Sequence, residues 1–591
     1  MITRRRLPEI TWAREIASLD DEELKRRLDQ LPVERQIDLF LISGWSERLR
    51  IIKNSEAAPE IVRALPEEEV FLTIKGVGEE DALPLVALTT PSQLRFILDV
   101  ELWQRDTIDE EKARNWLRYI LSCGEQKVIQ LFRTVDRELA ALMLSKLIYL
   151  IPNEENAPPP PEGLPSIMPD EFFTILVRVP DEAANVELLL RILRGWNRDR
   201  FYDLLFDVYG RVGAETEEEA YRWRSSRLEE KGLLEFEEAV EIYGYIGETE
   251  ARDLARLAGE IYYRRELPAK PPVYPVLLGD PKTFLHEVLT SIDDEDLANR
   301  LRAEIAFAAN RVLVADAAAI GELDAMKHAL DRVFSLVNLG IIYLVGTDHE
   351  AAIRTLRTIP VKDLFQIGFS RVIDIKTLAQ EMVRKWWPEW RTRGLVFLEH
   401  PENEIVRGAL MRVPQYYSLA SGEDVEFRDF RTMDEVSRTR RVIQQVDTVA
   451  YVLFGRLGIP RPHDAKPALK DVFAQGIEDI NLRNLMVTGF VHYGLTGEFR
   501  IDPIKRDDVK SLFETLLEAT PRGKSIRAGS VEQFLEWLRG IAGLDSQNWQ
   551  MAEAFVRDAL KDFGEEISLI ASWKDVDPRY VSSLIFSRTG S

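Results

Sequence analysis

The stretch LPEEEVFLTIKGVGEEDALPLVALTTPSQLRFIL, residues 65–98, decides the fold class. Short apolar runs follow one another in it, and prolines at positions 66, 84 and 91 precede them. Proline suits the first turn of a helix because the amide hydrogen that it lacks has no partner there. Acidic residues near these starts complement the positive end of the helix dipole. The stretch therefore predicts a series of about three short, stacked helices.

The glycines of this stretch have a structural interpretation. Gly76 and Gly78 do not form a dinucleotide-binding fingerprint, because a third glycine and a preceding strand are missing. We expect Gly76 to end one helix and the acids at 79–81 to begin the next.

Helix-start signals recur along the chain, where a short oxygen side chain stands three residues before Glu or Gln, the spacing of a capping box. The pairs are Asp20 with Glu23, Thr90 with Gln93, Thr216 with Glu219, Thr432 with Glu435, and Ser530 with Gln533. Alternating strand patterns are scarce, and the best one, FFTILVRV at 172–179, is equally compatible with a buried helix. These patterns predict an all-α, multi-domain helical protein.

The first part of the chain is repetitive. LPVE begins at residue 31 and LPEE at residue 65, with shorter helical units between and after them. Units too small to bury their own apolar face must stack on their neighbours. We therefore expect an irregular α-solenoid over residues 1–151. A plain helical bundle is the alternative, because the period is imperfect.

Composition shifts divide the rest of the chain. The segment PNEENAPPPPEG at 152–163 is typical of an extended linker, with a proline-rich docking ligand as the alternative. We expect the following segments: a helical domain at 164–265, a break at 266–279, a helical domain with a loop-rich tail at 282–458, a boundary at 459–467, and a C-terminal helical segment at 468–591.

Bulk composition excludes several classes of protein. The 591 residues carry a formal net charge of −23, which disfavours nucleic acid and anionic membranes as partners because phosphate binding requires a basic footprint. No run approaches the roughly 18 apolar residues of a membrane span, and no apolar signal region follows the N-terminal arginines. The single cysteine, Cys123, permits no intrachain disulfide, which favours the cytoplasm.

Local motifs for catalysis, metals or cofactors are missing, so we assign no catalytic residue, metal ligand or cofactor, while a catalytic site assembled from distant residues stays open. RGKS at 522–525 lacks the earlier glycine of a phosphate-binding loop, where Glu518 stands instead. The six histidines form no local metal pair, and one cysteine makes structural zinc improbable. The acidic run at 293–296 lacks the glycine and terminal glutamate of a calcium loop and predicts a helix cap instead.

Two clusters are candidate binding surfaces. Trp386, Trp387 and Trp390 stand among basic residues in KWWPEWRTRG, a combination that suits stacking or a protein contact. The alternative is a helix end whose tryptophans pack into the core.

In the second cluster, Arg224, Arg227 and Lys231 share one side of a predicted helix and would suit an anion. The alternative is ion pairing with Glu229, Glu230 and their neighbours.

Three segments resemble a family of uncharacterised bacterial proteins known only as a domain of unknown function. They are DALPLVALTTPSQLRFILDVELW at 81–103, EAYRWRSSRLEEKGLLEFEEAVEIY at 219–243, and ANRVLVADAAAIGELDAMKHALDRVFSLVNLGIIYL at 309–344. The resemblance implies a largely helical, soluble bacterial protein without an assigned activity. The Leu-Pro-Glu-Glu units also resemble the helical N domain of magnesium transporters and the armadillo-like modules of the flagellar motor switch protein, which implies a superhelical contact surface or a cation-sensing acidic face.

Three functional hypotheses follow. The first is a cytoplasmic scaffold or adaptor that binds a protein partner along the N-terminal solenoid. The second is an enzyme with a site between the middle helical domains that uses Arg224, Arg227 and His328. The third is magnesium or calcium sensing by the acidic N-terminal helices. Oligomeric state and partner identity are left open.

Overall fold

The fold is that of a computed structural model, which describes residues 16–587 with short gaps. The gaps are residues 105, 155–156, 158, 162, 168–169, 211–213, 258–282, 319, 465–479, 521–522, 569, 571 and 578–580. The chain divides between Phe369 and Ser370 into an N-terminal and a C-terminal unit. This division falls within the predicted domain at 282–458. The predicted break at 266–279 lies outside the described residues.

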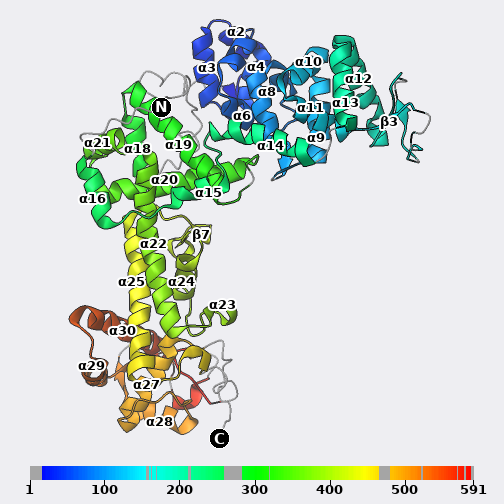
Figure 1. The fold of residues 1–591 in the computed structure, drawn as a ribbon. Helices are drawn as coiled ribbons and strands as arrows, with labels where there is room; N and C mark the ends of the chain where they lie inside the picture. The colour runs from blue at the N-terminus through cyan, green and yellow to red at the C-terminus, as the bar shows by residue number, and fades with distance from the viewer. Residues whose placement is uncertain are drawn as a thin grey trace. The chain divides into compact units, whose positions relative to one another are not determined.

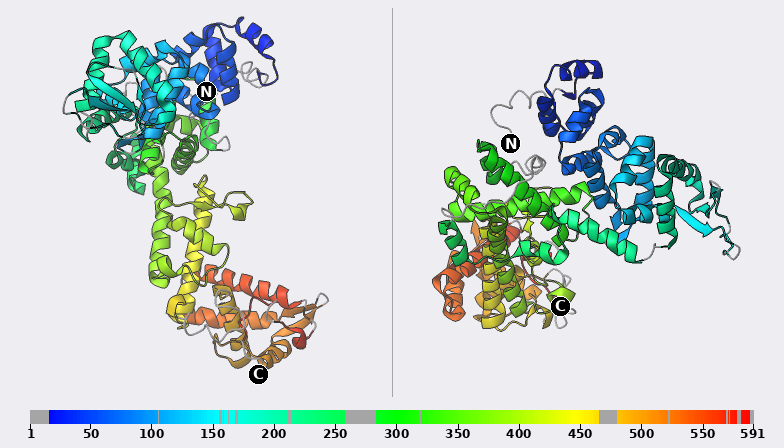
Figure 2. Two further views of the ribbon diagram at one scale, coloured as in Figure 1. Left: turned by 90° about the vertical axis from the view of Figure 1, so that its right-hand side faces the viewer. Right: turned by 45° about the horizontal axis from the view of Figure 1, so that its top comes forward.

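The N-terminal unit is predominantly helical. From α2 to α13, helices that are close in sequence also lie close in space (Figures 1 and 2). Its helices up to the proline-rich segment are α2 (Asp21–Leu28), α3 (Val33–Ile42), α4 (Trp45–Asn54), α5 (Ala58–Ala64), α6 (Glu67–Val77), α7 (Leu83–Leu88), α8 (Pro91–Glu101), α9 (Glu110–Ser122), α10 (Glu125–Thr134) and α11 (Arg137–Ser145). Those after it are α12 (Ala183–Trp196), α13 (Arg198–Gly210), α14 (Ala214–Glu229), α15 (Phe236–Ala239), α16 (Glu248–Leu257), α18 (Phe284–Ser291), α19 (Glu295–Ala315), α20 (Leu323–Val345), α21 (His349–Thr358) and α22 (Val361–Trp386).

Helix starts follow the predicted signals in three of the five pairs. Thr90 and Thr432 form complete capping boxes, and the Asp20 side chain accepts a hydrogen bond from the Glu23 amide. The remaining two pairs lie inside helices: α14 begins before Thr216 and α29 before Ser530.

The end of α6 corrects one expectation. The helix continues through Gly76 to Val77, and Gly78 ends it with a φ of 101°, a conformation that favours glycine. Gly76 has a packing role instead, since a Cβ added there would lie 2.5 Å from the Trp45 ring. Close packing of α4 on α6 therefore requires this glycine.

Buried side chains close the ends of the short helices. Gln36 donates from Nε2 to the carbonyls of Leu28 and Leu31, at 2.9 and 3.0 Å. Gln93 donates in the same way to Val62 and Leu65, at 2.7 and 2.9 Å. These bonds satisfy carbonyl groups that a helix end leaves without partners. This glutamine-to-carbonyl contact occurs at two helix ends, but the solenoid itself stays a prediction.

Lys127 performs the same task at the end of α7 with a charged group. Its buried Nζ lies 2.7 Å from the Thr89 carbonyl and 2.6 Å from the Thr89 hydroxyl, and burial lowers its pKa to about 8. The folded state therefore binds fewer protons than the unfolded state between about pH 8 and the usual lysine pKa near 10.4.

Stability is expected to rise with pH across that window. The free energy of unfolding of the protein, minus that of a Lys127→Met variant, should grow by roughly 3 kcal/mol between about pH 7.5 and 10.5. Taking the difference cancels groups that titrate in both proteins. Urea unfolding at a series of pH values measures it, and a difference that is constant with pH contradicts the lowered pKa.

Small antiparallel sheets interrupt the helices. The strands of the N-terminal unit are β1 (Trp103–Gln104), β2 (Thr107–Ile108), β3 (Ile148–Pro152), β4 (Ser166–Ile167) and β5 (Phe173–Val177), and β3, β5 and β4 form one sheet in that order. The segment at 172–179 thus contains a strand and not a helix. The proline-rich segment 152–163 connects β3 to β4 within this sheet.

Helix α20 is the most apolar long helix of the described chain. By length and composition it is the single described helix that could span a membrane, but 61% of its most apolar window is buried inside the structure. Its hydrophobicity is therefore that of an interior helix.

The C-terminal unit begins within α22, whose second half runs beside α25 (Figure 1). Trp386 donates from Nε1 to Asp447 of α25 at 2.6 Å. The helices are α23 (Trp390–Arg393), α24 (Glu402–Leu410), α25 (Met433–Ala450), a π-helix (Tyr451–Arg456), α27 (Leu482–Thr496), α28 (Arg506–Thr515), α29 (Ala528–Ala542) and α30 (Ser546–Ser568). The strands are β6 (Tyr416–Tyr417), β7 (Phe427–Arg428), β8 (Leu517–Thr520) and β9 (Gly523–Ile526), paired as two hairpins.

Candidate anion-binding pocket

A cavity of about 380 Å³ lies where the α10–α11 and α12–α13 corners meet, and we call it the arginine pocket. Its lining residues are Phe132, Arg133, Val135, Arg137, Ala140, Leu193, Trp196, Arg200, Phe201, Asp203 and Leu204. The volume falls within the range of small-ligand sites, about 300–1,000 Å³. Three arginines in one cavity stand out in a chain of net charge −23.

Two of these arginines share one aromatic ring. The guanidinium of Arg133 lies 5.2 Å from the centroid of the Trp196 ring, and that of Arg200 lies 5.5 Å from it. Neither guanidinium has a carboxylate partner within the described part of the chain. Both side chains are exposed to solvent, while the indole holds them by cation–π attraction. Their hydrogen-bond donors are thus available to a ligand.

Carboxylates neutralise only part of the pocket's charge. Arg137 is ion-paired with the buried Asp207. Asp203 lines the cavity and is exposed, without an ion-pair partner among the described residues. Three guanidinium groups therefore face two carboxylates, and the surplus lies at Arg133 and Arg200.

Helix ends explain how these side chains meet. Arg133 is in the last turn of α10, and Trp196 is the last residue of α12. Asn197 then accepts a hydrogen bond from the Arg200 amide at 2.9 Å, which starts α13. Arg200 thus stands at the positive end of a helix dipole, where a cation is unfavourable by about 0.3–1 kcal/mol. A residue whose charge opposes the helix dipole is typical of a functional position.

The pocket's chemistry suits binding. A guanidinium forks two hydrogen bonds onto a carboxylate or phosphate, and these charge-assisted bonds are stronger than neutral ones. The lining residues include no Ser, Cys, His or Lys that would pair with Asp203 as nucleophile and base. The arrangement therefore favours recognition of an anion over reaction with it.

The predicted cluster of Arg224, Arg227 and Lys231 is occupied by carboxylates of the same chain. Arg227 forms a two-point contact with Asp99, at 2.7 and 2.8 Å, and reaches Asp136 at 2.7 Å. These partners lie 128 and 91 residues away in sequence, so the expected local partners Glu229 and Glu230 are not the ones used.

The other two cations of the cluster also serve α14. Arg224 is buried and donates to the Asp99 carbonyl at 2.6 Å, with its guanidinium 5.5 Å from the Trp103 ring centroid. Lys231 pairs with Glu67 and Glu68, at 2.5 and 3.2 Å. Together these contacts hold the α14 region against α6, α8 and α11, and each nitrogen of the Arg227 guanidinium already donates to a carboxylate of the chain.

Replacing Arg227 by methionine should destabilise the N-terminal unit by about 2–3 kcal/mol, because the Asp99 carboxylate would lose its fork while staying buried. Burial already raises the pKa of Asp99, against the opposing effect of Arg227. Urea unfolding measures the loss. The control is Arg222→Met on the same helix, where an exposed ion pair with Glu218 is removed and the change should stay within about 0.5 kcal/mol.

The predicted tryptophan surface is largely interior. Trp387 is fully buried and donates to the Val396 carbonyl at 2.6 Å, and Trp386 is 6% exposed. Trp390 is half-buried at the start of α23. Two of the three rings therefore belong to the core of the C-terminal unit.

The residues of the other hypotheses lie apart. His328 is exposed on α20, and in the described structure no contact joins it to Arg224 or Arg227. No group of three His, Cys, Asp or Glu side chains within the described ranges is placed to hold a metal ion. Several acids of the N-terminal helices are ion-paired instead, as Glu69 is with Arg48 and Glu101 with Lys75.

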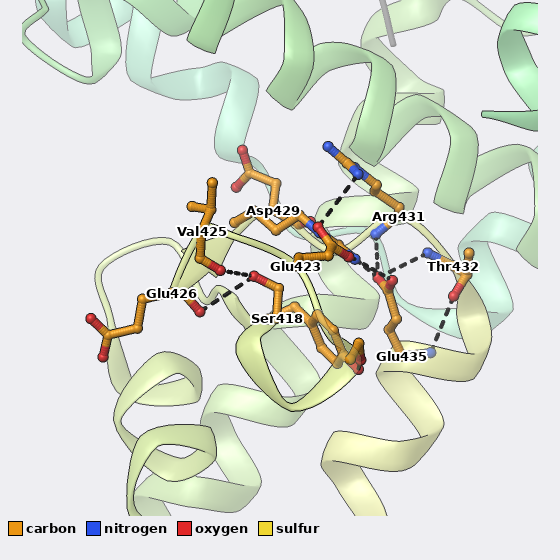
Figure 3. Close-up of polar contacts among 11 residues, drawn as sticks. Ser418, Glu423, Val425, Glu426, Asp429, Arg431, Thr432 and Glu435 are labelled. Carbon is orange, nitrogen blue, oxygen red and sulfur yellow. Dashed lines mark hydrogen bonds and ion pairs between the residues drawn. The ribbon is translucent and has the colours of Figure 1, made fainter. Parts of the chain in front are cut away.

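A second arginine cluster, in the C-terminal unit, is fully paired (Figure 3). Arg428 lies 2.6 Å from Glu423 and 2.8 Å from Glu435. Figure 3 shows Arg431 beside the same two carboxylates. Burial lowers the pKa of Arg428, but the two carboxylates outweigh it and leave that pKa raised. Glu435 also accepts from the Arg431 amide at 2.7 Å and completes the capping box of Thr432. This cluster fastens the β6–β7 hairpin to α25 and offers no free cation.

We did not predict the arginine pocket from the sequence. A signal was present in RGWNRDR at 194–200, where three arginines surround a tryptophan. Its significance depends on Arg133, which is far away in sequence and meets Trp196 only through the packing of α10 on α12.

Fold and pocket together define a predominantly helical protein with an arginine-lined pocket in its N-terminal unit. The chain belongs to the family of unknown function DUF6178, whose model matches residues 25–587. No curated protein and no solved structure matches it. The resemblance to an uncharacterised family is thus confirmed, while the resemblance to magnesium transporters and the motor switch protein stays a prediction.

Proposed function

We propose that the protein is a cytoplasmic interaction scaffold whose N-terminal unit binds an acidic segment of a partner protein in the arginine pocket. One observation carries the proposal: two guanidinium groups without carboxylate partners in the described chain lie over one indole ring beside a cavity. Every other arginine cluster described above is occupied by carboxylates of the chain itself.

The overall acidity of the chain does not prevent such binding. At physiological salt, charges are screened beyond about 8 Å, so an approaching carboxylate senses the nearest groups. Those nearest groups are Arg133 and Arg200, with one exposed carboxylate, Asp203, in the same cavity. The donors of the two arginines are solvent-exposed and need not break an existing ion pair. Carboxylates thus meet a local positive site on an acidic surface.

The test uses fluorescein-labelled hexaglutamate as the probe and the full chain as the protein. We expect Arg133→Ala/Arg200→Ala to bind at least about tenfold more weakly, since each charge-assisted hydrogen bond contributes about 1.5–3 kcal/mol. The control is Arg191→Ala/Arg222→Ala, which removes two exposed arginines that are paired with Glu187 and Glu218. If both variants lose the same affinity for hexaglutamate, the loss reflects only the lower positive charge of the protein, and the proposal is contradicted.

A further inference from the structure

The arginine pocket has a negative side as well as a positive one. Its positive side consists of Arg133 and Arg200, whose guanidinium groups lie over the Trp196 ring. Its negative side is Asp203, which lines the cavity, is exposed and has no ion-pair partner within the described residues. An unpaired carboxylate repels a ligand that carries only negative charge. A ligand that also carries a positive group would turn this repulsion into attraction.

The conformation of Arg200 leaves Asp203 unpaired. The two residues are three positions apart on α13, a spacing at which opposite charges on a helix can pair. The Arg200 guanidinium lies instead 5.5 Å from the centroid of the Trp196 ring, four residues earlier in the chain. In the part of the chain that the structure describes, no ion pair joins Arg200 to Asp203. Charges of opposite sign thus line one cavity without neutralising each other.

Arg137 does not neutralise Asp203 either. Arg137 of α11 is ion-paired with Asp207, one helical turn after Asp203 on α13, and α11 packs on α13. The hydrogen bond that Arg137 donates to Asp207 raises the pKa of Arg137 against the effect of burial, and the charges of Asp207 and Asp203 raise it further. Both carboxylates therefore act on one guanidinium, which can balance only one of them. One negative charge remains on this side of the cavity.

We propose that the acidic segment bound by the pocket also carries a lysine, whose ammonium group pairs with Asp203 while acidic neighbours bind Arg133 and Arg200. The inference rests on the proposed function and names the chemistry of the partner more closely. Asp203 disfavours a segment that is only acidic, and the two arginines disfavour a segment that is only basic. A pocket with both signs of charge therefore selects a mixed segment more sharply than the arginines alone would.

The remaining lining of the cavity suits the aliphatic part of a lysine. Its apolar residues are Phe132, Val135, Ala140, Leu193, Phe201 and Leu204. A lysine can lay its methylene groups on such a surface and keep its ammonium group at a polar partner. The flexible stem also lets the ammonium group adjust its position relative to the acidic neighbours.

The test compares two peptides on the full-length protein. The first is fluorescein-labelled Glu-Glu-Lys-Glu-Glu, and the second has acetyl-lysine in place of lysine, which keeps the stem and removes the charge. We expect the unmodified protein to bind the lysine peptide at least about threefold more tightly, as one ion pair at a partly exposed site allows.

Variants separate this inference from the proposed function. Asp203→Asn should abolish the advantage of the lysine peptide and bind the acetyl-lysine peptide more tightly than the unmodified protein does, because the repulsion is gone. Asp253→Asn, which removes an exposed carboxylate on α16, is the control of equal net charge and should keep the lysine advantage. Equal binding of both peptides by the unmodified protein, or a lysine advantage that persists in Asp203→Asn, overturns the lysine inference alone. Failure of both peptides to bind overturns it together with the acidic-segment proposal.

Discussion

Replacing Gly340 by alanine is expected to lower the free energy of unfolding of the N-terminal unit by about 3 kcal/mol. Gly340 of α20 is buried against α22, and an added Cβ would overlap the backbone carbonyl oxygen of Leu364. Gly368 of α22 faces the Leu336 carbonyl in the same way. Backbone cannot swing aside as a flexible side chain does, so the two helices would have to separate. Gly368→Ala should have an effect of similar size.

Urea unfolding followed by hydrogen exchange of α20 peptides measures this loss for the N-terminal unit alone. The control is Gly540→Ala in α29, where an added Cβ meets nothing within 4 Å. There the substitution should be neutral or stabilising by up to about 1 kcal/mol, because alanine favours a helix more than glycine does. Unchanged protection of α20 amides from hydrogen exchange in Gly340→Ala would contradict the close packing of α20 on α22.

The second large effect is expected from Arg48→Met, at about 3–5 kcal/mol. Arg48 is 1% exposed and lies 3.1 Å from Glu69, which is fully buried. It also donates to the carbonyls of Leu41 and Ser43, at 2.7 and 3.1 Å, near the end of α3. Removing it takes a charged partner from a buried carboxylate and leaves both carbonyls with one donor fewer.

The double variant Arg48→Met/Glu69→Leu separates these causes. It also removes the buried charge of Glu69, so it should be less destabilised than Arg48→Met alone, although the two carbonyls still lack their donor. Hydrogen exchange of α3 and α6 reports the local effect. A double variant less stable than the single one would show that the buried charge of Glu69 is not the main cost.

Local signals predicted most of the secondary structure. The capping boxes at Thr90 and Thr432 involve residues three apart, so their chemistry is legible in the sequence. Gly78 replaced Gly76 as the helix end because packing against Trp45, and not local conformation, determines the role of Gly76. The strand at 173–177 stayed ambiguous since its partner β3 is fixed only by tertiary pairing.

The candidate site depended on contacts that no local pattern contains. The predicted Arg224, Arg227 and Lys231 have the spacing of an anion site, but distant acids occupy them. Arg133 and Arg200 stand in unremarkable sequence contexts and become a site only when α10 packs on α12. The folded structure decides which arginines and lysines can still bind a ligand, because those that form ion pairs within the chain are already occupied.

The most direct test of the arginine pocket is reversal of its charge. The full-length variant Arg133→Glu/Arg200→Glu is titrated with labelled hexaglutamate and with labelled hexalysine, beside Arg191→Glu/Arg222→Glu as a matched control of equal net charge. We predict that only the pocket variant loses hexaglutamate and binds hexalysine more tightly, since opposite charges then meet at the same site. Undiminished hexaglutamate binding by the pocket variant, or the same change in the control, would contradict the account.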